Sequence, residues 1–466
     1  MGEMWRRSAT ELASAIASGD VSAVEVVQSH LERIEAVNPA VNAVTLVLAD
    51  DALQAAKEAD RAVADGEPLG VFHGVPFTIK ENVDVAGSAT TQGVPALAGA
   101  IAPIDAPVVE RLRAAGAIPL ARTNLPDMAL RVHTDSSLHG VTRNPFDGTK
   151  TAGGSSGGEA AALATGMSPL GLGNDIGGSL RNPAYCCGIA SLKPTAHRVP
   201  SASSTSPQEP LLVSQLMSVE GPMARRVMDV RAAFKVLAGA HSRDPFCVPA
   251  PFDGPALSAP IRVAIVPEPP GGATTPTVAA AVRAAGDALA DAGYDVVEAT
   301  PPLVEEAIET WSRWIISEIA HLKPQMRQIM SPTAMQFLDW AESSVGTVDF
   351  AGSVELMMKR HEIARAWSAF LDERPLVVGP VWTVPPFPAG WDAESEANAL
   401  ATLELMRFVT PMNLLGLPAA CVPTGVVDGL PTGVQVVGRW FREDVCLDAA
   451  EAIEQRLGTI TPIDPR

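Results

Sequence analysis

The chain has 466 residues, of which 47% are hydrophobic and 19% charged, a composition typical of a folded globular protein with a substantial core. Its 34 Lys and Arg residues against 53 Asp and Glu residues give a formal net charge of −19, which argues against nucleic-acid binding and against binding to an anionic membrane. Five cysteines without a CxxC spacing argue against a zinc site and a disulfide framework, and the N-terminal residues lack the apolar core of a signal peptide, so a reducing, cytoplasmic location is expected.

The first half of the chain alternates predicted helices with short apolar segments. Residues 8–36 are predicted to form an amphipathic helix, in which Ser8 and Ser22 each stand three positions before a glutamate, the capping-box spacing. A second helix is predicted at 50–65, followed by strand and turn at 68–87. A helix, a glycine and a strand follow at 106–125 and again at 277–300. This alternation predicts an α/β/α layered domain with a mainly parallel or mixed sheet.

Three further segments depart from this alternation. Residues 199–217 are rich in Ser and Pro and are expected to form a loop. Residues 301–375 carry Trp and Met at helical spacing, which indicates either a helical core or a helical region that lines an apolar substrate pocket. The apolar stretch 409–427 contains three prolines and is interpreted as buried core with strand character rather than a membrane span.

Six residues with almost no side chain, GGSSGG at 153–158, require an explanation. A flexible linker would have disordered flanks, yet a predicted helix and an apolar segment follow. A phosphate-binding loop would end in Gly-Lys-Ser/Thr, yet Lys150 precedes the glycines. We therefore interpret the segment as a tight backbone passage that presents a serine hydroxyl.

A second Gly-Ser element, Ile176-Gly177-Gly178-Ser179, follows soon after. Consecutive amides without bulky side chains can form a nest of N–H donors, which suits a developing oxyanion, and a serine at its end suits a nucleophile. The alternative is a Gly-rich turn before a helix.

The third element is Lys80, which ends the apolar run in GVPFTIKEN. Burial would disfavour its ammonium form and supply a neutral amine as a base. A surface lysine at the end of a strand is the alternative.

Taken together, these elements resemble the amidase signature family of Ser–cis-Ser–Lys amidohydrolases, of the standalone bacterial type. The resemblance rests on GVPFTIKEN (74–82), on the segment TAGGSSGGEAAALATGMSPLGLGNDIGGSLRNPAYCCGIASLKPT (151–195) and on 408–441. It extends over most of the chain and is weakest at 301–400. It implies an α/β/α fold with a central mixed sheet covered by helices on both faces, in one domain over 1–466. Within that domain it implies N-terminal helices at 1–68, a catalytic core at 69–225, a variable substrate-pocket region at 301–400 and C-terminal core strands with a helix at 401–466.

The resemblance also implies roles for individual residues. Ser179 would be the nucleophile, Ser155 a proton relay that follows a cis peptide bond, and Lys80 the general base. The oxyanion hole would be built from the backbone N–H groups of Ile176, Gly177, Gly178 and Ser179. Supporting roles are expected for Ser156, Asp175 and Arg181, with a surface ion pair as the alternative for the last two. Substrate-binding roles are expected for Met128, Ala129, Leu130, Gly154 and Arg198, and a solvated loop arginine is the alternative for Arg198. No metal or cofactor is expected.

The implied activity is hydrolysis of C–N bonds in a small-molecule amide, anilide or carbamate (urethane). Aryl acylamidases and urethane-cleaving enzymes are the nearest analogies that this interpretation suggests. Alternatives are the glutaminase subunit of a tRNA-dependent amidotransferase and a non-catalytic relative. The predicted nucleophile Ser179 is followed by Leu180 and Arg181 and so does not stand in a G-x-S-x-G element, which argues against a Ser–His–Asp triad. His73 and His133 are candidates to line the site, with a purely structural role as the alternative. Members of the family are often homodimers, and the oligomeric state is left open.

Overall fold

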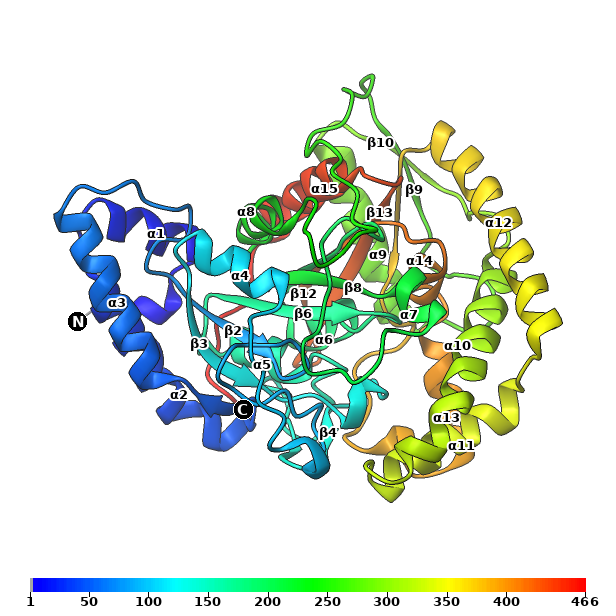
Figure 1. Ribbon diagram of the computed structural model, residues 1–466. Helices are drawn as coiled ribbons and strands as arrows, with labels where there is room; N and C mark the ends of the chain where they lie inside the picture. The colour runs from blue at the N-terminus through cyan, green and yellow to red at the C-terminus, as the bar shows by residue number, and fades with distance from the viewer. Residues whose placement is uncertain (1–2) are drawn as a thin grey trace.

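An eleven-stranded sheet runs through the computed structural model, which describes residues 3–466 (Figure 1). Its strand order is β1-β3-β2-β6-β8-β7-β12-β13-β11-β9-β10. Both parallel and antiparallel pairs occur, so the predicted mixed sheet is confirmed. The strands are β1 Val44–Val47, β2 Pro76–Lys80, β3 Ile118–Thr123, β6 Leu170–Asp175, β7 Ala190–Lys193, β8 Val219–Ala224, β9 Arg262–Ile265, β10 Asp295–Glu298, β11 Leu376–Pro380, β12 Ala419–Val427 and β13 Leu430–Gly438, and a separate two-stranded sheet contains β4 Asp135–Ser136 and β5 Gly140–Val141.

Helices cover both faces of the sheet. In β11, Val378 packs in the same apolar cluster as residues of α9 and α15, whereas its neighbour Val377 packs in the cluster of α10 and α14. Because successive strand residues point to opposite faces, these clusters form the two helical layers. The predicted α/β/α layering is therefore confirmed. The helices are α1 Ala9–Ala17, α2 Ala23–Val41, α3 Ala49–Ala64, α4 Pro107–Ala114, α5 Gly157–Ala164, α6 Arg181–Cys187, α7 Leu212–Met217, α8 Val227–Leu237, α9 Pro276–Asp291, α10 Val304–Met326, α11 Pro332–Val345, α12 Phe350–Glu373, α13 Glu396–Leu405, α14 Thr410–Leu414 and α15 Glu443–Leu457.

The N-terminal segment forms two helices in place of the single helix predicted at 8–36. Ser8 and Ser22 each cap their own helix through a complete capping box, as their spacing predicted. Between the helices, Gly19 adopts a φ of 75°, which ends α1 and lets the chain turn into α2. The capping signal was therefore correct, and the second capping box marks the start of a second helix.

The predicted helical region after residue 300 forms α10, α11 and α12, on the opposite side of Figure 1 from α1, α2 and α3. Two other expectations need correction. The predicted loop at 199–217 ends in α7, and the stretch from residue 409 begins with the short helix α14 before entering β12. Within the described residues, 3–466, no helix has the length and apolar character needed to cross a bilayer.

Helix α5 lies very close to the end of β3, and this approach positions the serine loop that precedes α5. A Cβ atom at Gly158 would lie 2.4 Å from the backbone nitrogen of Asn124, a contact that requires the backbone to shift.

We therefore expect Gly158→Ala to lower the free energy of unfolding by about 1–3 kcal/mol, the usual cost of overpacking. Denaturant unfolding of the purified variant measures this. Gly99→Ala is the matched control because a Cβ there meets nothing within 4 Å. Equal stability of the two variants would contradict the packing argument.

Candidate active site

The side chain of Lys80 is fully buried at the carboxyl end of β2. This strand runs parallel to both β3 and β6, so polar residues at the ends of three strands meet at one edge. Lys80 Nζ lies 2.8 Å from Ser155 Oγ and donates to Asn174 Oδ1 at 2.6 Å. The structure therefore brings together the predicted base and the predicted relay, and the alternative of a surface lysine is wrong.

Burial lowers the pKa of Lys80 from its usual 10.5 to about 7. Three buried carboxyl groups, those of Glu220, Asp175 and Glu159, oppose this effect by attracting the ammonium form. Burial also raises the pKa of Glu159 to about 7, although hydroxyl groups of Thr78 and Thr123 donate to its carboxylate. Near neutral pH, the Lys80 amine is thus available in its uncharged form.

Ser155 lies on the loop that enters α5, and the peptide bond that precedes it is cis. The backbone of Gly154 passes so close to residues 131–133 that a Cβ there would lie 2.7 Å from the carbonyl oxygen of Arg131. Ser156 is the N-cap residue of α5, and its buried Oγ has no hydrogen-bond partner within residues 3–466. A side-chain hydrogen bond from Ser156 therefore does not hold the loop in this structure.

Ser179 ends the tight turn between β6 and α6 and is 7% exposed, on the wall of a pocket. Gly178 adopts a φ of 103°, a conformation that favours glycine. Its N–H donates to Asp175 Oδ1 at 2.7 Å. The prediction that Gly178 contributes to the oxyanion hole therefore needs correction, since its donor is already occupied. The amides of Ile176, Gly177 and Ser179 are the remaining candidates.

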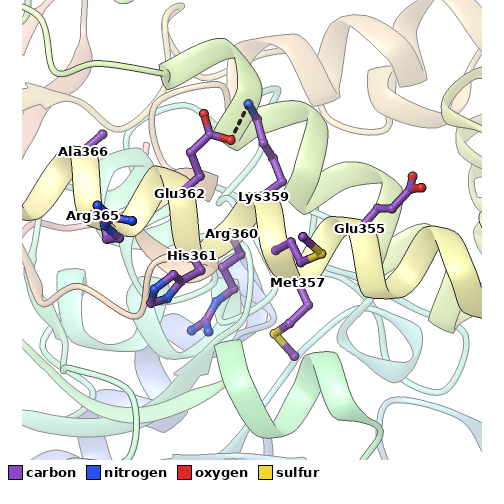
Figure 2. A pocket seen from close by; sticks show the side chains of 9 residues that line it. Glu355, Met357, Lys359, Arg360, His361, Glu362, Arg365 and Ala366 are labelled. Carbon is purple, nitrogen blue, oxygen red and sulfur yellow. Dashed lines mark hydrogen bonds and ion pairs between the residues drawn. The ribbon is translucent and has the colours of Figure 1, made fainter.

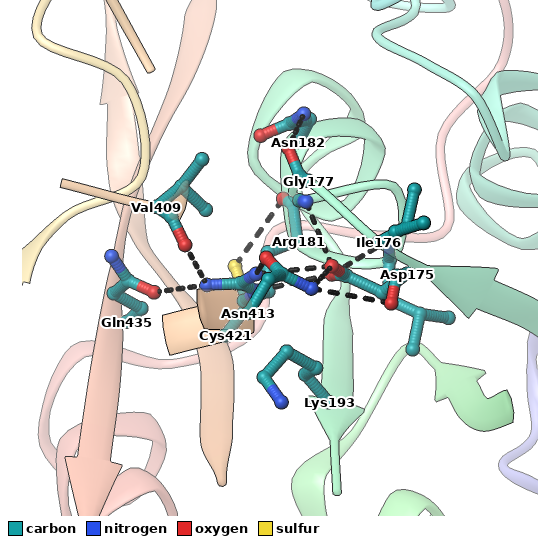
Figure 3. Close-up of polar contacts among 12 residues, drawn as sticks. Asp175, Ile176, Gly177, Arg181, Asn182, Lys193, Val409, Asn413, Cys421 and Gln435 are labelled. Carbon is teal, nitrogen blue, oxygen red and sulfur yellow. Dashed lines mark hydrogen bonds and ion pairs between the residues drawn. The ribbon is translucent and has the colours of Figure 1, made fainter. Parts of the chain in front are cut away.

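Asp175 and Arg181 hold this turn through a fully buried ion pair (Figure 3). The guanidinium donates twice to the carboxylate, at 3.0 Å each, and also to the carbonyl of Val409 and the side chains of Asn413 and Gln435. Burial alone would raise the pKa of Asp175, but Arg181 overcomes this and holds the pKa well below its usual range. A surface ion pair is excluded, and the predicted supporting geometry is present.

An apolar pocket opens at Ser179, between the turn that carries this serine and the helices α10 and α11. Trp311 of α10 donates from its indole N–H to the carbonyl of Ile176 at 3.1 Å, and its ring packs against Gly177. The predicted role of the 301–375 helices in lining a pocket thus has a structural basis. The apolar side chains that α10 and α11 contribute are Trp311, Ile315, Ile316, Ile319, Phe337, Leu338 and Ala341.

The predicted substrate-binding residues separate into two groups. Ala129 and Leu130 line the pocket, while Met128 packs with the apolar cluster of α11 beside it. Arg198 is not at the site, and this prediction was wrong. Its guanidinium is buried and donates to the carbonyls of Ala250 and Pro251, so it holds a distant loop.

Neither candidate histidine contributes a free imidazole to the pocket. His73 binds the carbonyl of Ala59 in α3. His133 binds Thr151 Oγ1 at 2.9 Å, and burial lowers its pKa. Both are therefore engaged in structural contacts.

Sequence reasoning missed several polar residues of the site. Asn174 lies in β6 directly before Asp175, next to the glycine-rich turn, and its position could have been noticed. Glu220 lies further along the chain in β8 and had no sequence signal. Arg131 lines the pocket, but Asp392 binds its guanidinium at 2.8 and 2.9 Å, so this charge is already paired.

A wide second hollow of about 1080 Å³ lies along α12, lined by residues 355–366 (Figure 2). Its side chains include Met357, Arg360 and His361. None of the three predicted catalytic residues contributes to it, so the hollow at Ser179 remains the candidate site.

Comparison with known proteins connects this site to one family. The family model described as Amidase matches residues 25–447. An indoleacetamide hydrolase of Bradyrhizobium diazoefficiens is 42% identical over 462 residues, which cover 98% of this chain and 88% of that protein. A glutamyl-tRNA(Gln) amidotransferase subunit of Salinispora arenicola is 33% identical, with 99% of each chain covered.

Solved structures of similar proteins agree with this assignment. A 6-aminohexanoate cyclic dimer hydrolase in complex with substrate matches with a TM-score of 0.85 and 29% identity, and 97% of each chain is covered. A bacterial aryl acylamidase of the amidase signature family matches with a TM-score of 0.84 and 26% identity, and 96% of each chain is covered.

The buried ion pair generates a prediction about stability. Removal of Arg181 leaves Asp175 as an uncompensated buried charge, so we expect Arg181→Met to lower the free energy of unfolding by about 3–5 kcal/mol. Denaturant unfolding measures this loss. The control is Arg439→Met, which removes an exposed ion pair with Asp372 and should cost less than about 1 kcal/mol. A small loss in Arg181→Met would show that the pair does not hold the turn.

Proposed function

Because the chain belongs to the Amidase family, we propose that it hydrolyses the C–N bond of a small-molecule amide through a serine acyl-enzyme. Ser179 Oγ attacks the carbonyl carbon and gives its proton to Ser155, whose own hydroxyl proton passes to Lys80 Nζ. The free amides of the turn stabilise the oxyanion, and Ser155 then returns a proton to the leaving nitrogen. Water hydrolyses the acyl-enzyme by the same relay.

The contact between Lys80 and Ser155 is the observation that carries this proposal. A neutral amine has two N–H donors and one lone pair, and Asn174 Oδ1 accepts one of the donors. At 2.8 Å from Ser155 Oγ, the amine is within the distance at which its lone pair can accept the Ser155 proton. Burial supplies the neutral form near pH 7.

We propose an aryl-substituted primary amide, of the indoleacetamide type, as the first substrate class. The pocket at Ser179 is bounded by aromatic and branched apolar side chains, which suit an indole or phenyl ring. The named activity of the 42% identical relative points the same way. Anilides and aryl carbamates present the same kind of ring and remain within the proposal.

The alternative, a glutaminase subunit of a tRNA-dependent amidotransferase, has a specific difficulty. Glutamine carries an α-ammonium and an α-carboxylate, and both need polar partners when buried. Within residues 3–466, Arg131 is the one ionisable residue that lines the pocket, and Asp392 already binds its guanidinium. The pocket therefore suits an uncharged aryl group better than a free amino acid.

A substrate panel tests this assignment. We expect the wild-type protein to hydrolyse indoleacetamide faster than a p-nitroanilide, an aryl carbamate or glutamine, because its pocket is apolar. Ser179→Ala should lower kcat by at least about 10³-fold, since the nucleophile is lost. Ammonia release and chromophore release provide the measurement.

Ser156→Ala is the matched control, because it removes the neighbouring hydroxyl, which has no hydrogen-bond partner within residues 3–466. It should retain most of the activity. Cleavage of glutamine alone would favour the amidotransferase alternative. Full activity in Ser179→Ala would assign the nucleophile elsewhere.

The lowered pKa of Lys80 predicts the pH dependence. An amine with a pKa of about 7 is protonated below that pH and cannot accept a proton, so kcat/KM should rise through about pH 7 and then level off. Lys80→Met should remove this activity, whereas Lys57→Met, on the exposed side of α3, should leave the profile unchanged. A profile that rises only above about pH 9 would mean that burial does not lower the pKa of this base.

A further inference from the structure

A third cavity, which is polar and has a volume of about 550 Å³, lies beside the Lys80 network and shares no lining residue with the apolar pocket. Asn82 lines this cavity and accepts from Asn174 Nδ2 at 3.0 Å, and Asn174 in turn accepts from Lys80. The side chain of Asn174 therefore links Lys80 to a residue of the cavity wall. Glu220 also lines it and has no part in the reaction described so far.

The sheet places Glu220 next to this network. β6 pairs with β8 in antiparallel register, and Asn174 lies directly opposite Glu220. Side chains of directly opposed residues lie on the same face, with Cβ atoms about 4.5–5.5 Å apart. β2 is the other neighbour of β6, so Lys80, Asn174 and Glu220 come from three adjacent strands.

The carboxyl group of Glu220 is incompletely satisfied. Oε1 accepts from Ser201 at 3.3 Å, and the buried Oε2 has no hydrogen-bond partner within residues 3–466. A buried carboxylate needs a compensating charge. Arg243, which also lines the cavity, binds Glu110 at 2.8 Å, so its charge is already paired. Among the described residues 3–466, Lys80 is the cation whose charge acts on Glu220 and lowers the pKa of its carboxyl group.

We propose that Glu220 is a positioning residue for Lys80, and that its charge sets the pH at which Lys80 becomes a free base. This inference rests on the proposed role of Lys80 as the general base. Burial alone weakens the amine as a base, and a nearby carboxylate restores part of its basicity. A base whose strength matches the working pH accepts the Ser155 proton more effectively than a weaker one.

The other charged groups around the pair do not replace Glu220. Asp175 and Glu159 also face Lys80, but Asp175 is bound to Arg181, and hydroxyl donors satisfy Glu159. Asp84 faces Glu220 from the segment after β2 and disfavours its charged form. Burial raises the pKa of Glu220 to about 7 and lowers that of Lys80 to the same range, so the two groups titrate together.

The test measures how fast a fluorophosphonate labels Ser179 across the rising limb of the pH profile, which requires no knowledge of the natural substrate. In Glu220→Gln, loss of the carboxylate should shift the midpoint of this limb about one unit lower, because the ammonium form loses its partner. Glu220→Asp keeps the charge and should restore the wild-type midpoint. Glu209→Gln removes an exposed carboxylate from the rim of the same cavity and is the matched control.

Three results would overturn the proposal. In the first, the pH profile of labelling has the same midpoint in wild type and Glu220→Gln, while Lys80→Met still abolishes labelling. This result would leave the proposed function intact. Another is an equal shift in Glu220→Asp and Glu220→Gln, which would indicate a packing effect instead of a charge effect. Labelling that is indifferent to Lys80→Met would overturn the proposed function along with the role of Glu220.

Discussion

The burial of one amine is the constraint on which the rest of the site depends. Lys80 has no exposed surface, and its stem enters the site from a strand that is paired on both sides. A charged lysine is costly in such a place, and burial therefore shifts the balance toward the neutral form. The uncharged amine can still form its hydrogen bonds to Ser155 and Asn174, so these contacts do not require a positive charge on Lys80. The paired strands β2, β6 and β8 and the serine loop hold Ser155, Asn174 and the surrounding carboxyl groups around this nitrogen atom.

Two cavities of opposite character lie in this part of the molecule, one at Ser179 and one beside the Lys80 network. On the side of Ser179, α10 and α11 supply an apolar wall, and the one ionisable residue that lines it within the described part of the chain is Arg131, which is bound to Asp392. On the side of Asn174, serine, asparagine and carboxylate groups surround a larger cavity. The proposed aryl substrate and the buried amine of Lys80 require different surroundings. An aryl ring binds best where water is excluded, whereas protonation of a buried amine requires polar groups nearby. The two cavities share no lining residue, so the apolar surface at Ser179 and the polar groups beside Lys80 are kept apart.

Local signals in the sequence predicted the local structure well. The capping boxes, the helix-to-strand alternation and the glycine-rich turns depend on neighbours within a few residues, and each appears in the structure. Long-range contacts were not predictable from such signals. The Gly178 amide is occupied because the side chain of Asp175 folds back onto it, and Arg198 is buried because carbonyls in a distant loop accept its protons. The position of Glu220 depends on the β6–β8 register, which no motif encodes.

Helix α10 and the turn that carries Ser179 are connected through Trp311. Its indole N–H binds the carbonyl of Ile176, and its ring occupies the space that a side chain at Gly177 would need. The peptide group between those two residues is among the remaining candidates for stabilising an oxyanion, since the Gly178 donor is engaged. A substitution that reshapes the pocket at Trp311 therefore also alters the orientation of that peptide. The shape of the pocket and the geometry of the Ser179 turn are therefore coupled at Trp311. Substitutions at Ile319 or Leu338, which line the same pocket, leave the Trp311–Ile176 hydrogen bond in place.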